Sequence, residues 1–318
     1  MALSEFNLIE RFFCCSKGDD EGARIGIGDD GAILSLDSRF ELVVSTDTLV
    51  EGVHFLPNTD PESLGHKVLA VNLSDLAAMG ATPKWVFLSL TLPDTDEGWL
   101  ESFSTSFLSL ADRYSVELAG GDTTRGPLSL SVTILGQVEK GRGLLRSGAK
   151  VGDKIFVTGF IGDAGLGLQE AMQNRSENLS ALERYLKPVP RVQIGCLLEG
   201  IASSCIDISD GLAADLGHIL KKSGVGASIQ YEMLPLSTSV KHYIDSNKDE
   251  LFPLSSGDDY ELCFTVPEAN LGDLLELKGG LDCAITEVGE IEAEMGLRVY
   301  QGKEEIKLER LGYQHFNE

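Results

Sequence analysis

The sequence predicts a protein of mixed α and β structure in two domains, and three observations lead to this fold class. The chain has 318 residues, which is room for two domains of ordinary size. Hydrophobic residues make up 42% of the chain, enough for packed cores. Segments that alternate apolar and polar residues, as half-buried strands do, are interleaved with longer amphipathic segments typical of helices that cover a sheet.

The first half, residues 1–138, is expected to combine strands with long helices. Alternating β-branched and polar residues predict strands over residues 39–47, 84–92 and 128–138. Helical spacing predicts helices over residues 1–13, 61–80 and about 97–114. The segment 61–80 has a proline near its start and a glycine as its stop, as helices often do. The opening helix lacks the basic start and apolar run of a signal peptide.

Residues 139–152 are the expected linker, because this stretch is glycine-rich, basic and poor in apolar residues. The second half, 153–318, opens with a strand and a glycine-rich turn and then alternates the two patterns. Strands are expected over residues 155–159, 203–209, 226–231 and 260–266. Helices are expected over residues 163–172, 211–224 and 271–277. This order predicts an α/β or α+β domain.

Acidic residues dominate the charge of the chain. Fifty Asp and Glu stand against 26 Lys and Arg, which gives a net charge of −24. This balance argues against nucleic acid or an anionic membrane as a partner. No stretch reaches the roughly 20 apolar residues of a membrane span. A phosphate ligand remains compatible with the charge, because divalent cations can reverse its local sign.

The six cysteines stand at positions 14, 15, 196, 205, 263 and 283. None forms a C-x-x-C, and most lie in apolar segments, which indicates small core residues in a reducing, cytoplasmic compartment. The adjacent pair Cys14 and Cys15 leaves a reactive role open. The five histidines show no H-x-x-x-H spacing, which disfavours a zinc site.

An early glycine motif has carboxylates where a phosphate would lie. Gly26, Gly28 and Gly31 match the G-x-G-x-x-G of phosphate-binding turns, but Asp29 and Asp30 stand between the last two glycines. Two carboxylates repel a phosphate at contact distance. The turn can therefore serve a phosphate only if cations lie between the acids and the ligand. The chain has no GxxxxGK[ST] and hence no P-loop.

Further carboxylates stand in apolar segments or glycine-flanked turns, where an unpaired charge is costly. They are Asp47, Asp75, Asp122, Asp207, Asp210, Asp258, Asp259 and Glu261. Taken singly, such residues also fit helix caps and ordinary turns. Taken together, they predict hard oxygen ligands for Mg²⁺, which proteins usually bind through a few carboxylates and substrate phosphates.

Seven motifs in order resemble the thiamine-monophosphate kinase family. They are "GIGDDGA", "STDTLVEGVHF", "NLSDLAAMGATP", "GGDTTRG", "TGFIGDAGLGL", "DISDGLAADL" and "SGDDYEL", and the closing "LGYQHF" is similar to the family's tail. The resemblance implies an aminoimidazole-ribonucleotide-synthetase-like architecture: an N-terminal α+β domain that pairs in a homodimer, and a C-terminal α/β domain. It also implies transfer of the γ-phosphoryl group of ATP to thiamine monophosphate, giving thiamine diphosphate and ADP in the last step of thiamine diphosphate biosynthesis.

The resemblance also implies roles for the matching residues. Several Mg²⁺ ions would be held by Asp30, Ser45, Thr46, Asp47, Asp75, Asp122, Asp207 and Asp210. ATP would meet Gly121, Asp122, Arg146 and Ser209. Thiamine monophosphate would meet His54, Glu261 and either Phe316 or Tyr313. Arg146 also fits a solvated linker, and His54 also fits a packed core histidine.

No residue is assigned as a catalytic group, because phosphoryl transfer needs in-line positioning and neutralised charge. The acceptor is itself a phosphate, which is already ionised at neutral pH, so direct in-line attack within a ternary complex is expected. The strands between residues 84 and 138 are expected to leave an apolar sheet face that a single copy does not cover. This face favours a C2 homodimer through the N-terminal domain.

Three other functions stay open from the sequence. One is another synthetase of the same superfamily, of the selenophosphate or aminoimidazole ribonucleotide type; the placement of Cys14 and Cys15 in a helical stretch disfavours the former. A second is a two-metal phosphohydrolase, which would release inorganic phosphate without an acceptor. A third is a non-catalytic metal-binding protein, which the absence of an EF-hand loop disfavours.

Overall fold

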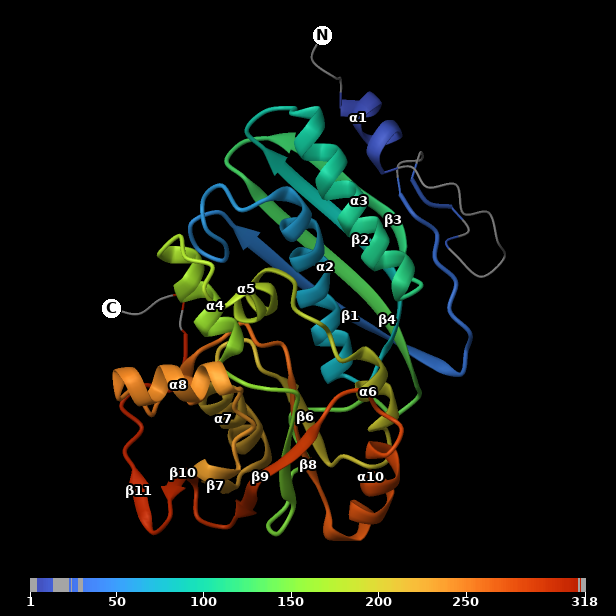
Figure 1. The fold of residues 1–318 in the computed structure, drawn as a ribbon. Helices are drawn as coiled ribbons and strands as arrows, with labels where there is room; N and C mark the ends of the chain where they lie inside the picture. The colour runs from blue at the N-terminus through green and yellow to red at the C-terminus, as the bar shows by residue number, and fades with distance from the viewer. Residues whose placement is uncertain (1–4, 14–22, 24, 28–30, 314, 316–318) are drawn as a thin grey trace. The chain divides into compact units, whose positions relative to one another are not determined.

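The computed structural model describes residues 5–13, 23, 25–27, 31–313 and 315, which fall into two units (Figure 1). By their contacts, the first unit comprises residues 1–76 and 81–141, and the second comprises residues 77–80 and 142–318. Each unit is built around a sheet of its own. No helix in the described part of the chain is both long and apolar enough to cross a membrane.

The first unit contains a four-stranded sheet in the order β1-β4-β2-β3. Its elements in chain order are α1 (Glu5–Phe12), β1 (Phe40–Val50), α2 (Pro61–Ala78, the last two residues of which count with the second unit), β2 (Thr82–Leu92), α3 (Glu97–Arg113), β3 (Glu117–Arg125) and β4 (Ser129–Glu139). β4 runs antiparallel to β1 and β2, and β3 runs parallel to β2. Within the described residues, the strands and helices predicted for this half are confirmed, and β3 is a further strand that was not predicted.

Two helices, α2 and α3, cover one face of this sheet (Figure 1). The carboxylate of Asp96 caps α3 by accepting from the backbone N–H groups of Gly98 and Trp99. A Cβ atom at Gly65 of α2 would lie 2.3 Å from the carbonyl oxygen of Phe103 in α3. The glycine therefore lets the two helix backbones approach closely while Phe103 is fully buried.

The double glycine before Asp122 lies in a strand that the sequence pattern did not predict. Residues 117–125 form β3, the edge strand beside β2. A Cβ atom at Gly121 would lie 1.9 Å from the carbonyl oxygen of Leu88, and one at Gly120 would lie 2.9 Å from the ring of Phe87. Only glycines let β3 pass this close to β2, and their lack of side chains also removes the alternation by which a strand is predicted.

The second unit contains a seven-stranded sheet in the order β11-β10-β7-β9-β5-β8-β6. Its elements are β5 (Lys154–Thr158), α4 (Asp163–Met172), α5 (Leu179–Leu186), α6 (Val192–Leu197), β6 (Ser204–Asp207), α7 (Leu212–Ser223), β7 (Gly226–Gln230), η1 (Tyr231–Met233), α8 (Thr238–Asn247), α9 (Phe252–Ser255), β8 (Leu262–Val266), η2 (Glu268–Asn270), α10 (Leu271–Lys278), β9 (Ile285–Glu292), β10 (Gly296–Gln301) and β11 (Glu304–Ile306). The predicted mixture of helix and strand is confirmed. In this sheet β10 and β7 pair in parallel, and the other pairs among its described strands are antiparallel.

The core of the second unit draws on both halves of its chain. Ile155, Ile206, Leu216 and Val288 are buried together in one hydrophobic cluster. Cys205 and Cys263 are buried, as expected of small core residues, and Cys196 and Cys283 are half-buried; all four are free thiols. Cys14 and Cys15 lie outside the described residues.

Candidate active site

Alternation along β1 separates three of the predicted Mg²⁺ ligands. Ser45 Oγ donates a hydrogen bond to Asp75 Oδ2 of α2 at 2.5 Å. Asp47 follows two residues later on the strand and so shares the face of Ser45. The Thr46 side chain lies on the opposite face, where its Oγ1 is 2.9 Å from Thr133 Oγ1. Ser45, Asp47 and Asp75 are therefore brought to one side of the sheet, and the Thr46 side chain is not.

Asp75 interrupts a helix that is otherwise packed against the sheet. Its neighbours Leu73 and Leu76 are fully buried, while Asp75 itself is half-buried. A carboxylate at such a position is costly unless it is hydrogen-bonded or paired. The hydroxyl of Ser45 supplies one hydrogen bond, and the shared face with Asp47 suits a divalent cation.

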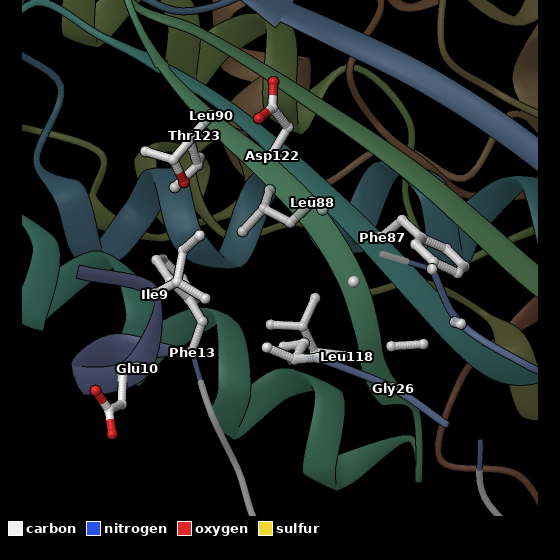
Figure 2. A pocket seen from close by; sticks show the side chains of 16 residues that line it. Ile9, Glu10, Phe13, Gly26, Phe87, Leu88, Leu90, Leu118, Asp122 and Thr123 are labelled. Carbon is white, nitrogen blue, oxygen red and sulfur yellow. The ribbon is translucent and has the colours of Figure 1, made fainter. Parts of the chain in front are cut away.

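Gly121 and Asp122 line a cavity of about 800 Å³ in the first unit (Figure 2). Figure 2 shows Asp122 and Thr123 at one end of this cavity and Gly26 at the other. The walls are apolar side chains from α1, β2, β3 and the segment before β1, among them Ile9, Phe13, Ile27, Leu88, Leu90 and Leu118. A cavity of this size with mostly apolar walls and a few polar groups, here Glu10, Asp122 and Thr123, is typical of a small-molecule site.

His54 is held by the turn that follows β1. The backbone N–H of Val50 donates to His54 Nδ1 at 3.0 Å, and the N–H of His54 donates to the carbonyl of Val50 at 3.0 Å. Gly52 supplies the left-handed conformation of the turn, with φ 77°. The ring is half-buried, and in its neutral form the proton lies on Nε2, because Nδ1 accepts. His54 thus has a fixed orientation at the end of β1.

In the second unit, the turn between β6 and α7 carries three predicted ligands. Asp207 ends β6 and is buried, while Ser209 and Asp210 are half-buried. The backbone N–H groups of Ser209, Asp210 and Gly211 all donate to Oδ2 of Asp215, at 3.0, 3.0 and 3.1 Å. One carboxylate therefore organises three consecutive residues of the turn.

Burial and neighbouring charges shift the pKa values of the carboxyl groups at this turn. Burial raises the pKa of Asp215 to about 8, and the carboxylates of Asp207 and Asp210 act in the same direction. Burial also raises the pKa of Asp210, while the positive charges of His315 and Arg146 oppose the rise. Arg146 is exposed, so it is near enough to influence Asp210 and open enough to meet a ligand.

Two further segments hold the outer side of the turn. The N–H of Asp258 donates to the carbonyl of Ser209 at 2.8 Å. The N–H of Tyr313, near the end of the chain, donates to the carbonyl of Asp210 at 3.0 Å. Tyr313 therefore reaches the turn through its backbone, and its side chain is 47% exposed. Phe316, the other aromatic residue predicted to meet thiamine, and Asp30 lie outside the described residues.

Glu261 is fully buried and its carboxylate is saturated with donors. Thr158 Oγ1 donates to Oε2 at 2.6 Å, and Arg191 donates from Nε to Oε2 at 2.7 Å and from Nη2 to Oε1 at 2.5 Å. Arg184 Nη2 donates to Oε1 at 2.5 Å. In this arrangement the carboxylate holds two arginines together, and a thiamine contact through it would require these donors to move.

The glycine-rich turn "TGFIGDAG" leads into α4, and the side chain of Asp259 lies at the amino end of this helix. Its carboxylate accepts from the N–H groups of Gly162 and Ala164 at 2.6 and 3.1 Å. Helix amino ends of this kind often bind phosphate. Here a buried side chain of the chain itself takes that place, and burial raises its pKa to about 8.

The sequence-based prediction missed Asp215, Arg184 and Arg191. For Asp215 a signal existed: it falls on the apolar stripe of α7 with Leu212 and Ile219, where a charge needs a partner. Among the described residues, no three His, Cys, Asp or Glu side chains gather closely enough to form a ready metal site.

Two family models define the class of this protein. The N-terminal domain of AIR synthase related proteins matches residues 28–138, and the C-terminal domain of the same proteins matches residues 150–302. The fold of two sheet-based units, with acidic motifs in each, is therefore that of an AIR synthase related protein.

Curated relatives narrow the class. The thiamine-monophosphate kinase of Escherichia coli (strain K12) is 48% identical over 99% of both chains. The thiamine-monophosphate kinase of Aquifex aeolicus (strain VF5) is 36% identical over 91% of this chain and 92% of its own. The chain belongs to the thiamine-monophosphate kinase family.

Solved structures agree with this membership. The crystal structure of the thiamine-monophosphate kinase from Stenotrophomonas maltophilia K279a matches with a TM-score of 0.86 and 43% identity, over 94% of this chain and 97% of its own. A second solved relative, complexed with AMPPCP and TMP, matches with a TM-score of 0.78 and 34% identity, over 91% of this chain and 92% of its own.

Proposed function

We propose that this protein transfers the γ-phosphoryl group of ATP to thiamine monophosphate, giving thiamine diphosphate and ADP. The observation that carries the proposal is the 48% identity, along the full length of both chains, to the thiamine-monophosphate kinase of Escherichia coli. A relative of the same fold has been solved with AMPPCP and TMP, an ATP analogue and an acceptor, in one complex. Two ligands bound at once favour direct transfer over a covalent phosphoenzyme.

The cavity of the first unit is our candidate for the adenosine part of ATP. Its apolar walls suit a base and a sugar, and Gly121 and Asp122 are among its lining residues. The phosphates would then extend toward Asp122, where an exposed carboxylate repels them unless a cation intervenes. Ser209 and Arg146 of the second unit remain our predicted contacts for the nucleotide, Arg146 because its guanidinium suits a phosphate.

Mg²⁺ is the cation that we propose for these carboxylates. The residues predicted to hold it are Asp30, Ser45, Thr46, Asp47, Asp75, Asp122, Asp207 and Asp210. Asp47 and Asp75 fit this role because they lie on one side of the sheet with only partial burial and oxygen neighbours. For Thr46 the fit is confined to its backbone, since its side chain lies on the other face. When bound, the ions would screen the charges of the two reacting phosphate groups.

In this proposal the residues of the chain orient the two reactants, and no side chain acts as a nucleophile or general base. His54, whose ring orientation is set by the Val50 N–H, remains our predicted contact for the acceptor molecule. An ionised phosphate needs no general base, so in-line attack with inversion at the γ-phosphorus is expected. Glu261 remains our predicted thiamine contact, together with Tyr313 or Phe316. Inversion can be read from the product formed with chiral γ-thiophosphate ATP, and net retention would contradict it.

We also propose a C2 homodimer through the first unit. Leu42 and Val44 are 46% and 55% exposed, on the face of β1 opposite to α2 and α3. Two large apolar side chains in one row of an exposed sheet face are typical of a surface that a second copy covers. Light scattering should give about twice the 34.3 kDa mass of one chain, and Leu42→Lys should lower this mass.

The use of ATP is our reason for proposing a cytoplasmic location.

The decisive experiment supplies the protein with ATP, Mg²⁺ and a panel of phosphate acceptors and identifies products by mass. ADP and thiamine diphosphate should form together, and only with thiamine monophosphate present. Inorganic phosphate released without an acceptor would favour the two-metal phosphohydrolase. A different phosphorylated product would favour another synthetase of the superfamily. In EDTA, calorimetry should show the affinity for ATP lost, and unchanged binding would contradict the proposed bridging ions.

A further inference from the structure

The turn between β6 and α7 contains a set of donors that usually binds an anion from outside. Its three N–H groups, at residues 209–211, converge on one point at the amino end of a helix of 12 residues. Converging backbone N–H groups of this kind attract phosphates and carboxylates. Here they converge on Oδ2 of Asp215, a side chain from the first turn of the same helix.

Because Asp215 occupies these donors, the turn can offer a ligand its side chains and not its N–H groups. The side chains concerned are those of Ser209 and Asp210, which follow Asp207 at the end of β6. Asp215 is 3% exposed, so it lies beneath the turn and away from solvent. A residue in this position acts on a bound ion or nucleotide through the turn that it holds.

The carbonyl groups of the same turn are held from the other side. The carbonyl of Ser209 accepts from Asp258 N–H and that of Asp210 accepts from Tyr313 N–H. Gly211 has φ 123°, and a Cβ atom there would lie 2.9 Å from the backbone carbon of Ser255. The backbone of the turn is thus clamped on its carbonyl side by two segments, and on its N–H side by the single carboxylate of Asp215.

We propose that Asp215 is the positioning residue of the second unit's ligand turn: its three backbone hydrogen bonds set the directions in which Ser209 and Asp210 present their oxygens to a cation and its nucleotide. This inference rests on the proposed function, since it concerns the same nucleotide and the same ions. It adds a residue that touches neither of them. Residues that orient metal ligands in this way change metal affinity by about 10–100-fold when they are lost.

The test compares Asp215 with a second buried acid of the same unit. Asp153 is also buried, and its Oδ2 accepts from Lys150 N–H and Ser203 Oγ, away from the predicted ligands. Asp215→Ala, Asp215→Asn, Asp215→Glu and Asp153→Ala are prepared in the full chain. Urea unfolding fixes conditions in which each is folded. The affinity for Mg²⁺·AMPPCP is then measured by calorimetry, and the affinity for Mn²⁺, as a spin probe, by electron paramagnetic resonance.

We expect Asp215→Ala to weaken both affinities by about tenfold or more, because the turn loses its N–H clamp. Asp215→Asn keeps an acceptor oxygen at the same place and should recover most of the loss. Asp153→Ala should lower stability and leave both affinities unchanged. If Asp215→Ala does not fold, Asp215→Glu takes its place, because its longer side chain displaces the oxygen and should weaken binding similarly.

A folded Asp215→Ala or Asp215→Glu variant with wild-type affinities would overturn the inference. An equal loss of affinity in Asp153→Ala would overturn it too, since the effect would then be one of general stability. Failure of the proposed function is distinguishable, because it would be read from the products of the wild-type protein, whereas this inference is read from the affinities of the variants relative to the wild type.

Discussion

Several acidic side chains of the two units differ in burial and in the donors that surround them. In the first unit, Asp122 is exposed on an edge strand, and Asp75 is half-buried with the Ser45 hydroxyl as a donor. In the second unit, Asp215, Asp259 and Glu261 are buried, and each accepts from two or more donors of its own chain. An acidic motif therefore does not by itself indicate a cation site.

The difference follows from where each carboxylate finds its positive partners. A buried carboxylate is stable only if N–H groups or guanidinium groups replace the lost water. Glu261 has two arginines, and Asp259 has a helix amino end. The exposed Asp122 keeps its water and can exchange it for a cation and a phosphate. The variants below test this division, from the largest expected effect to the smallest.

Glu261→Gln should have the largest effect, on stability. Removing the carboxylate charge leaves Arg184 and Arg191 poorly compensated, each with less than a fifth of its side chain exposed. Breaking a buried pair in this way costs about 3–5 kcal/mol in the free energy of unfolding. Urea unfolding measures it. The matched control is Glu290→Gln, which loses a partly exposed pair with Lys154 and should cost less than about 1 kcal/mol.

A stable Glu261→Gln variant would break the comparison. If its free energy of unfolding stayed within about 1 kcal/mol of the wild type while the KM for thiamine monophosphate rose, Glu261 would be a substrate contact in the first place. The carboxylate would then resemble those of the first unit.

Asp47→Asn and Asp75→Asn should affect turnover and spare the fold. If both are cation ligands, kcat should fall by about 100-fold or more, equivalent to about 2.7 kcal/mol at the transition state. The free energy of unfolding should stay within about 1 kcal/mol, since neither residue is fully buried. Steady-state kinetics at saturating Mg²⁺ and urea unfolding give the two values. Asp37→Asn, an exposed acid paired with Arg39, serves as the control and should change neither.

Near-wild-type turnover of either variant would count against its ligand role. If Asp75→Asn unfolds, Asp75 would instead have a structural role, like that of the buried acids Asp215, Asp259 and Glu261.

The pH dependence of stability should separate Asp259 from the exposed acids. Its folded pKa is raised from 3.8 to about 8 by burial, against the pull of the Gly162 and Ala164 N–H groups and the Arg184 charge, while Glu261 acts with burial. Between these values the folded protein holds a proton that the unfolded chain has lost. The contribution of protonated Asp259 to the free energy of unfolding is therefore complete below about pH 4. It declines as the pH rises toward 8, by at most about 1.4 kcal/mol per pH unit.

Asp259→Asn removes this proton and provides the comparison. From pH 5 to pH 7.5 the free energy of unfolding of the wild type should fall relative to that of the variant. Many other acids titrate in this range, but they do so in both proteins and cancel. Parallel curves for the two proteins would show that the helix amino end and Arg184 keep Asp259 ionised throughout.

Ser45→Ala should have the smallest effect of the four. It removes one hydrogen bond to Asp75, worth about 0.5–1.5 kcal/mol, so kcat should fall by no more than about 13-fold. The control is Thr48→Ala on the other face of β1, where Oγ1 meets Ser131 Oγ at 2.8 Å. That variant should keep its turnover. If kcat of Ser45→Ala fell as far as that of Asp75→Asn, Ser45 would be as important an ion ligand as Asp75.

The sequence by itself determined the elements that carry a clear period. The strands at β1, β2 and β4 and the helices α2, α3 and α7 were predicted within a few residues, because alternation and helical spacing are local properties. It also predicted the family, through motifs that stand in order along the chain. The double glycine of β3 has no side chains to alternate, so that strand was not predicted.

Only the tertiary structure decided which acids are buried. Asp210 and Asp215 stand five residues apart in "SDGLAAD", and their local sequence does not say which of them accepts the N–H groups of the turn. Glu261 and its arginines at 184 and 191 are at least 70 residues apart in the chain. A carboxylate is neutralised from within or left to bind a cation according to partners that long-range packing supplies, and no local pattern encodes that packing.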